Sequence, residues 1–357
     1  MKGKVELRYK REDFKDFNNK VIFDVQFEKA SIASNDLNCL YNEFGKDNIF
    51  YVNTHALGTL NNFTLFDLKL ADKNQSEIIG SVNFKNLFGK GNQTFYMKGN
   101  FDRIATDYNQ VVRVLPRVLG KNLPNVLTKF GNINLAGAIE LTQKYINADV
   151  YLLSKLGELE SDFSMQNIDK INNAKYQGTI QLANFDLGTL FNEKNIGRAT
   201  LNLDIDGSGF TQKLLNTKLK GTIDKFYFNG YNYQSITVDG SMKMPYYKGY
   251  FNSNDPNLKM DFDGVVDLSK RANNYDFKAQ IDYADLYLLN FYKKDSTSVF
   301  RGKIDFKASG GSIDDLSGAL KIQDISYQNS KNSYYFEDFD ITSSFDQDKV
   351  RTITMNS

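Results

Sequence analysis

The stretch GTIDKFYFNGYNYQSITVDG, residues 221–240, places an Asn-Gly pair between two runs that are rich in aromatic and β-branched residues. Asn-Gly between such runs is a strong short-range signal of a β-hairpin, because both residues tolerate the positive φ that a two-residue type I′ turn requires. The sequence therefore predicts a hairpin with its tip at Asn229 and Gly230.

The aromatic and the aliphatic residues of this hairpin fall on opposite faces. Across a two-residue turn, one face carries Phe226, Phe228, Tyr231 and Tyr233. The other face carries Ile223, Ile236 and Val238. Either a β-bulge resets the register, or the aromatic tip lies at a rim while the aliphatic base lines a groove. We prefer the second arrangement.

Alternation of apolar and polar residues continues outside the hairpin. In DPNLKMDFDG, residues 255–264, every second residue from Leu258 to Phe262 is apolar, and ATLNLDIDGSG, residues 199–209, repeats the pattern. A period of two predicts strands with one apolar and one polar face, and the turn residues between them predict an antiparallel meander. Thirteen residues are predicted to line the inner apolar face: Leu201, Leu203, Ile205, Ile223, Ile236, Val238, Leu258, Met260, Phe262, Phe277, Ile281, Ile304 and Phe306.

A helical pattern interrupts the strands over TDYNQVVRVLPRVLGKNLPNVLTKF, residues 106–130. Val111, Leu115 and Val118 form a helical stripe, Thr106 is a suitable N-cap, and Pro116 and Pro124 break the helix. We predict two short helices in an insert at 106–128. The opposite face of this helix carries Arg113, Arg117 and Lys121. These side chains could contact acidic headgroups or a partner, but we favour a solvated surface.

The composition argues against several classes of function. The 44 basic and 43 acidic residues balance, so nothing favours nucleic-acid binding. One histidine and one cysteine cannot supply a zinc site, and we expect no metal, no cofactor and no enzyme activity. His55 is expected in a loop or at a strand edge rather than as a catalytic base. Asp314 and Asp315 are expected as turn residues rather than as the carboxylate pair of a glycosidase.

A weak repeat relates QLANFDLGTL at Gln181 to QIDYADLYLL at Gln280, 99 residues apart. We predict repeat copies at about 31–100, 180–280 and 280–357 within one continuous array over 1–357. Stacked repeats share one continuous core, so the chain length does not indicate the number of domains. No apolar run approaches the roughly 18 residues of a membrane-spanning helix, and residues 1–20 lack the apolar core of a signal peptide. The strand pattern at the C-terminus is cut short, which suggests a fragment of a longer protein.

Five strings occur in a characteristic order: VLPRVLGKNLPNVLTKFGNINLAG, YQGTIQLANFDLGTLF, LKGTIDKFYFNGYNYQSITVDGSM, GYFNSNDPNLKMDFDGVVDLSK and FRGKIDFKASGGSIDDLSGALKI. In this order they resemble the central part of the TamB-type translocation and assembly modules of the AsmA-like superfamily, over roughly residues 20–357. The match looks best with the longer versions in diderm bacteria that carry a Leu-Pro helical insert.

The resemblance implies an elongated antiparallel sheet, curled into a U-shaped hydrophobic groove. It also implies a periplasmic bridge between the inner and outer membranes that transports phospholipid and supports the assembly of outer-membrane proteins. The family's membrane anchor, and the C-terminal domain expected to meet an outer-membrane β-barrel partner, are not found in this sequence.

A sheet with one apolar face must cover that face or use it. About 20 to 25 strands at ~4.8 Å spacing would form a stack about 100 Å long, with an apolar face far larger than a monomer normally exposes. Alternation alone favours a pair of β-sandwiches. The repeat order and the resemblance favour the groove, in which a lipid tail gains about 0.8 kcal/mol per buried methylene. The competing function is a structural or adhesive β-repeat protein with a fully packed core.

Overall fold

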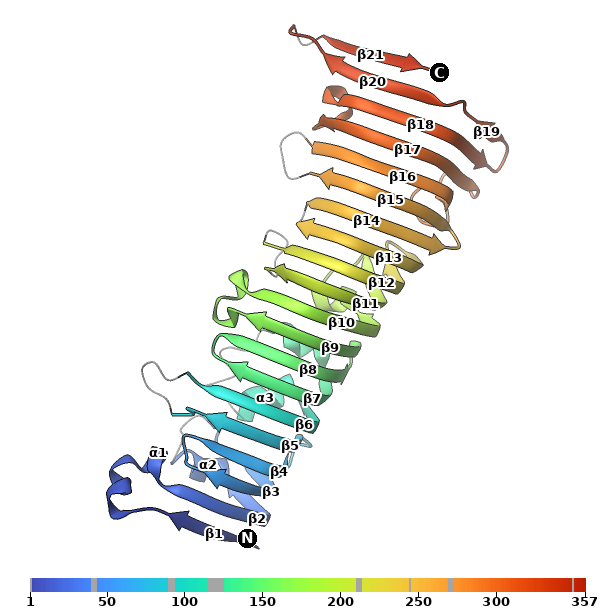
Figure 1. Cartoon of the computed structure of the whole chain (residues 1–357). Coiled ribbons are helices and arrows are strands. Elements are labelled where there is room, and N and C mark those ends of the chain that lie inside the picture. Colours follow the sequence, from blue (N-terminus) through green and yellow to red (C-terminus); the bar gives the residue numbers. More distant parts are fainter. Residues whose placement is uncertain are drawn as a thin grey trace. The chain divides into compact units, whose positions relative to one another are not determined.

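The computed structural model is mostly β and contains one antiparallel meander sheet of 21 strands with a few short helices (Figure 1). The structure describes residues 2–39, 44–88, 94–114, 125–209, 214–243, 245–268, 273–348 and 350–357. The predicted all-β class and antiparallel order are confirmed. Two packed sandwiches do not form, because the strands belong to a single sheet.

The chain divides into two compact units, Met1–Lys170 with Leu182–Leu190, and Ile171–Gln181 with Phe191–Ser357. Strand β10, Lys175–Asp186, contributes to both. The other strands of the first unit are β1 Lys2–Arg8, β2 Ile22–Ala33, β3 Ile49–Gly58, β4 Phe63–Asp72, β5 Glu77–Lys85, β6 Tyr96–Asp107, β7 Asn132–Thr142, β8 Tyr145–Ser154 and β9 Gly157–Gln166. Those of the second unit are β11 Ile196–Ser208, β12 Asn216–Phe228, β13 Tyr231–Lys243, β14 Tyr246–Asp255, β15 Leu258–Asp267, β16 Asn273–Asp285, β17 Ser298–Gly310, β18 Ser317–Asn329, β19 Ser333–Tyr335, β20 Phe339–Phe345 and β21 Arg351–Asn356.

The helices are one or two turns long. They are η1 Arg11–Asp16, α1 Phe17–Lys20, α2 Ser34–Leu37, α3 Tyr108–Val114, η2 Asn125–Phe130, η3 Ile168–Asn173, α4 Leu187–Phe191 and η4 Ile313–Asp315. Because neighbouring strands run in opposite directions, every second strand ends at the same edge of the sheet. Strands β2, β6, β10 and β16 all end at this edge, which we call the helical edge. There they lead into α2, α3, α4 and a helical turn that follows Asp285.

The predicted insert is found in part. α3 and η2 occupy its two ends, and the positions predicted between them, Leu115, Pro116, Arg117, Val118, Lys121 and Pro124, lie outside the described residues. The N-cap prediction is wrong, because Thr106 belongs to β6 and the Asp107 carboxylate accepts the hydrogen bond from the Gln110 amide at 3.0 Å. Arg113 is not simply solvated, since its guanidinium contacts the buried Asp72 carboxylate at 3.2 Å.

The hairpin at 221–240 forms as predicted, with φ of 48° at Asn229 and 83° at Gly230, and with Phe228 paired with Tyr231. The preferred arrangement of its faces is wrong. Ser235 adopts a φ of 54° and interrupts the alternation, so Tyr233 joins Ile236 in one buried cluster. The bulge alternative is not found either, since β12 and β13 keep one register from Thr217–Met242 to Phe228–Tyr231. The left-handed Ser235 instead turns the side chains that follow it to the other face.

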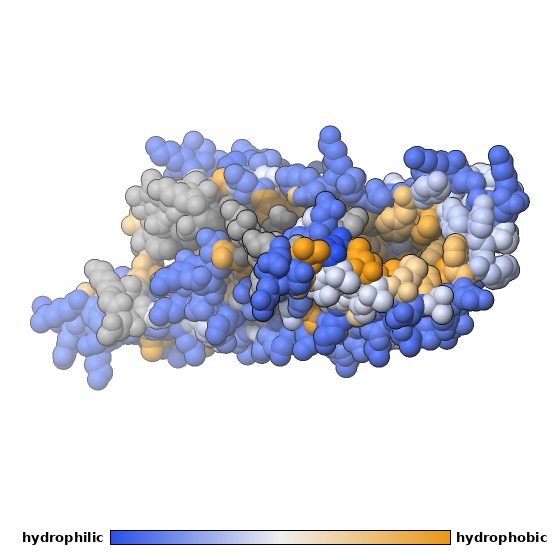
Figure 2. Space-filling model, turned by 90° about the horizontal axis from the view of Figure 1, so that it is seen from above, coloured by the Kyte–Doolittle hydropathy of each residue, from blue (hydrophilic) through white to orange (hydrophobic). Residues whose placement is uncertain are grey.

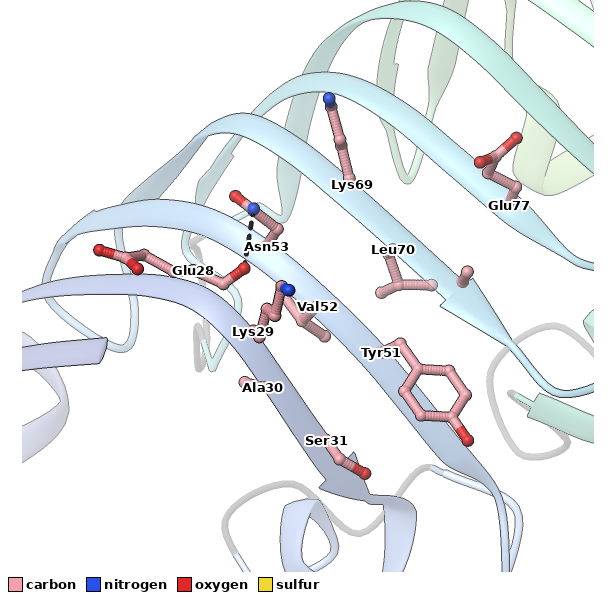
Figure 3. A pocket seen from close by; sticks show the side chains of 11 residues that line it. Glu28, Lys29, Ala30, Ser31, Tyr51, Val52, Asn53, Lys69, Leu70 and Glu77 are labelled. Carbon is pink, nitrogen blue, oxygen red and sulfur yellow. Dashed lines mark hydrogen bonds between the residues drawn. The ribbon is translucent and has the colours of Figure 1, made fainter. Parts of the chain in front are cut away.

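The sheet is neither closed on itself nor strongly curled, so the observed fold does not reach the U-shaped curl that the resemblance implies. The strands themselves bend part-way along their length, as the close view of β2–β5 shows (Figure 3). Register shifts between Phe27 and Ala30 of β2 and between Leu65 and Leu68 of β4 coincide with these bends. Such irregularities bend a strand locally.

Candidate functional site

The structure brings the thirteen predicted lining residues onto one face of β11–β17, which we call the apolar face. Cross-strand pairing aligns twelve of them in three rows that run across the strands. Row 1, nearest the helical edge, contains Leu201, Ile223, Ile236, Met260 and Ile281. Row 2 contains Leu203, Val238, Phe262 and Ile304. Row 3, the farthest from that edge, contains Ile205, Phe277 and Phe306. Leu258 precedes row 1 on β15 and pairs with Ala284.

Most of these side chains remain partly accessible. Ile236 and Val238 are buried, with 4% and 6% of their surface exposed, whereas the other eleven are half-buried and none is fully exposed. Over the C-terminal strands, Figure 2 shows hydrophobic side chains gathered between hydrophilic borders. A face of this kind can accept an apolar ligand without first opening a closed core. The role of these residues in binding a lipid stays a prediction.

Aromatic rings form a continuous series on this face. The ring centroids of Phe262 and Phe277 lie 5.2 Å apart, and those of Phe277 and Phe306 lie 5.6 Å apart. Tyr247 extends the series at 6.1 Å from Phe262, and Tyr275 lies 5.3 Å from Phe306. Tilted rings at these separations attract each other beyond the burial of their area. The series provides a preformed apolar surface across β14–β17.

Sequence reasoning missed Tyr247, Phe251 and Tyr275, which share this face. On β14 the alternating positions Tyr247, Gly249, Phe251 and Ser253 mix aromatic and small residues, so the strand lacks a run of apolar signals. Pairing with β15 reveals the face, because Phe251 lies opposite Phe262. The pairing register with β15 therefore identifies these apolar residues of β14, which the sequence pattern of β14 alone does not.

The opposite face is polar and bears ion pairs between neighbouring strands. They join Lys220 to Asp239 at 2.9 Å, Lys278 to Asp305 at 3.3 Å, Lys307 to Asp276 at 3.2 Å and Lys303 to Asp324 at 2.7 Å. Exposed pairs of this kind contribute little stability. Their arrangement identifies the polar face of the second unit.

The first unit has an apolar cluster of its own, which the sequence reasoning did not select. Leu68, Val82 and Phe101 are buried, and they pack with the half-buried Val52, Leu65, Leu70, Ile78, Phe84, Met97, Ile104 and Ile139. The cross-strand pairs Leu65–Val82 and Gly80–Phe101 align this cluster in the same manner as the rows of the second unit. Each unit therefore has apolar side chains gathered on its sheet.

A shallow hollow of about 440 Å³ lies in the first unit, with Lys29, Tyr51, Lys69 and Glu77 of β2–β5 around it (Figure 3). The Asn53 amide donates a hydrogen bond to the Glu28 carbonyl oxygen beside it at 2.9 Å. Its mixed charges and open form do not suit a defined small ligand, and it contains none of the predicted lining residues.

The other singled-out residues have structural partners. His55 lies within β3, not in a loop or at a strand edge, and its Nε2 is 2.8 Å from the Asp24 carboxylate. Asp314 and Asp315 were predicted as turn residues, and both lie in the short 3-10 helix η4. The Asp315 carboxylate accepts hydrogen bonds from the backbone of Gly311 and Ser312, which lower its pKa. Within the described ranges, no three His, Cys, Asp or Glu side chains are placed to hold a metal ion.

No match was found for this chain among protein families, curated proteins or solved structures. Among the described residues, no helix is both long and apolar enough to cross a membrane. The family resemblance therefore stays a hypothesis, and the functional argument depends on the geometry of the apolar face.

Proposed function

We propose that the apolar face binds the acyl chains of phospholipids and carries them along the sheet. The observation that carries this proposal is the alignment of the predicted lining residues in rows, with eleven of the thirteen half-exposed. An acyl chain gains about 0.8 kcal/mol for each methylene that leaves water. Rows that repeat from strand to strand offer a similar surface at each step, so a chain can move without one deep trap.

The accessible surface supports an uncovered apolar face. The chain exposes 21975 Å². A compact monomer of 40.8 kDa would expose ~15,000 Å² by the usual scaling with mass. A second layer packed over the apolar face would remove much of this excess. A bound lipid would cover part of the same area.

The wider role that we propose is a periplasmic bridge in outer-membrane biogenesis. It would be anchored in the inner membrane and connected to an outer-membrane β-barrel partner through regions outside this sequence, and it would support protein assembly as well as lipid transfer. The order of the five strings supports this role. A stronger, U-shaped curl of the sheet around bound chains is part of the same proposal.

Photo-crosslinking tests the lipid proposal directly. A photo-reactive residue at Met260 or Phe262 faces the proposed ligand, whereas Lys259 and Asp261 on the same strand face the opposite side and serve as matched controls. We expect phospholipid adducts at the two inner positions and not at the two outer ones. Absence of lipid adducts at both inner positions would contradict the proposal.

The second candidate is a structural or adhesive β-repeat whose inner face is filled by the chain itself. The tight packing of Ile236, Val238 and Leu289, which are at most 6% exposed, favours it locally. The half-exposed rows around them favour lipid. A fluorescent phospholipid added to the purified chain separates the two, since a filled face would leave its emission unchanged.

A further inference from the structure

A short segment crosses the helical edge of the second unit next to the apolar face. We call residues 286–292, the helical turn that follows β16, the strap. Its central residue, Leu289, has no exposed surface and belongs to one cluster with Tyr233, Ile236, Val238 and Ala284. The strap therefore covers Ile236 of row 1 and Val238 of row 2, the two buried lining residues.

The strap is built rigidly. The Asp285 carboxylate accepts hydrogen bonds from the amides of Tyr287 and Leu288 at 3.1 and 3.0 Å. The Leu286 carbonyl accepts from the amides of Phe291 and Tyr292, both at 2.9 Å. A carboxylate that satisfies the first amides of a turn fixes its conformation. The turn therefore holds Leu289 in place without help from a ligand.

The far end of the strap is fixed to a distant part of the unit. Asn290 adopts a φ of 64°, and its side-chain amide donates to the Asn229 carbonyl of the β12–β13 turn at 3.0 Å. The strap begins at β16, so it extends across the ends of the intervening β13, β14 and β15. The Asp285 amide, which donates to the Asn257 carbonyl at 2.9 Å, connects it to the β14–β15 turn on the way.

The first unit has a related arrangement. Helix α3 follows β6, and its Arg113 reaches back to Asp72 at the end of β4. The Val114 carbonyl accepts from the Gly45 amide, ahead of β3, at 2.9 Å. In both units a segment that leaves an even-numbered strand at the helical edge is tied back over the ends of earlier strands. The strap is therefore one of two such connections, with α3 as the other.

Accessibility changes along β13, where Tyr233, Ile236 and Val238 are buried and Met242 is half-buried. Row 3 lies four residues beyond row 1, about 13 Å along a strand. There Phe277 and Phe306 are half-buried, and the ring series from Tyr247 to Phe306 has no buried member. The buried cluster, which is formed by β13, the end of β16 and Leu289, is therefore distinct from the accessible ring series on β14–β17.

We propose that the strap excludes lipid from the buried cluster under Leu289, so that an acyl chain lies along the ring series of β14–β17 and crosses the strands. This inference rests on the proposed lipid-binding function and adds the path of the chain. The packed cluster under Leu289 leaves no room for a methylene chain without rearrangement, because protein interiors are close-packed. The ring series accepts a chain without such a rearrangement.

A photo-reactive lipid tests the path in the unmodified full chain. Vesicles of phosphatidylethanolamine that contain an analogue with a diazirine on one acyl chain are incubated with the protein and irradiated, and labelled residues are mapped by mass spectrometry. We expect adducts at Phe262, Phe277 and Phe306, and a several-fold lower yield at Ile236 and Val238. Leu289→Ala should raise labelling of Ile236 and Val238, whereas Leu288→Ala, which removes an exposed neighbour, should not.

The outcomes separate the two proposals. Labelling of the rings and of Ile236 and Val238 to equal extents in the unmodified chain would overturn the strap inference and leave lipid binding intact. A lack of labelling anywhere on the apolar face would overturn the proposed function and the inference with it. If Leu289→Ala does not fold, the map of the unmodified chain alone decides.

Discussion

Gly249 is a position at which a very small substitution should cause a large local loss of stability. It lies in β14 directly opposite Gly240 of β13 and Gly264 of β15, so three glycines meet in row 3. Its φ is +150°, which residues with a side chain rarely adopt. A Cβ at this position would lie 2.4 Å from both the Asp239 carbonyl oxygen and the Gly240 Cα.

The expected loss of stability in Gly249→Ala follows from the strained φ and from the close contact of the new Cβ with β13. Holding a residue with a side chain in this backbone region costs about 1–3 kcal/mol. Both atoms that the new Cβ meets belong to the backbone of β13, so they cannot rotate away as a side chain could, and forcing strands apart in a packed structure adds about 1–3 kcal/mol. We therefore expect a local loss of about 3 kcal/mol or more, since the two effects act together.

Hydrogen exchange measures this loss where it occurs. A loss of about 3 kcal/mol should speed exchange of the β13–β15 amides about a hundredfold. Lys248→Ala is the matched control, because its exposed side chain lies on the polar face one residue earlier, and it should change local stability by less than about 0.5 kcal/mol. Equal exchange rates in Gly249→Ala and the unmodified chain would refute the argument from backbone geometry.

Two further predictions concern the two faces and the behaviour at high pH. Phe277→Ala should destabilise the second unit by about 2 kcal/mol. Lys278→Ala, which breaks an exposed ion pair, should cost less than about 1 kcal/mol in the same denaturation series; equal losses would contradict the assignment of faces. Burial, with a hydrogen bond to Asp255, raises the pKa of Tyr231 to about 12 from 10.0. The stability that depends on its proton is complete below about pH 10 and is lost as the pH rises towards about 12. Tyr231→Phe should flatten this alkaline decline in thermal melts, and an unchanged decline would count against the burial of the phenol.

Which residues of one strand share the apolar face could be predicted, because alternation needs only local information. Leu258, Met260 and Phe262 share a face by the geometry of a strand alone, and the structure places them as expected. That Met260 lies opposite Ile281 depends on turn lengths and on a bulge between Lys259 and Met260. A shift of one residue would have moved a whole strand to the other face, so the row assignment had to come from the structure.

The strap could not be predicted, although its residues were noticed. The sequence QIDYADLYLL drew attention as a repeat of QLANFDLGTL, and both prove to end a strand and enter a helical turn. The repeat boundaries themselves stay a prediction. Nothing local shows that Leu289 will be fully buried while Leu288 is 46% exposed, because Leu289 packs against Tyr233, Ile236 and Val238 of β13, which lie far earlier in the chain.

Ser235 shows why strict alternation is a poor guide to which face a whole strand presents. If the period of two continued through β13, Tyr233 and Ile236 would point in opposite directions, and one of these large apolar side chains would lie in water. The left-handed Ser235 removes this conflict and places both in the buried cluster, with Tyr233 7% exposed. A small polar residue is well suited to this position, since burying both apolar neighbours compensates for a local backbone cost of about 1–3 kcal/mol. The irregularity in GTIDKFYFNGYNYQSITVDG therefore maintains the one-sided apolar face where a regular hairpin would have divided its aromatic and aliphatic residues between the two sides.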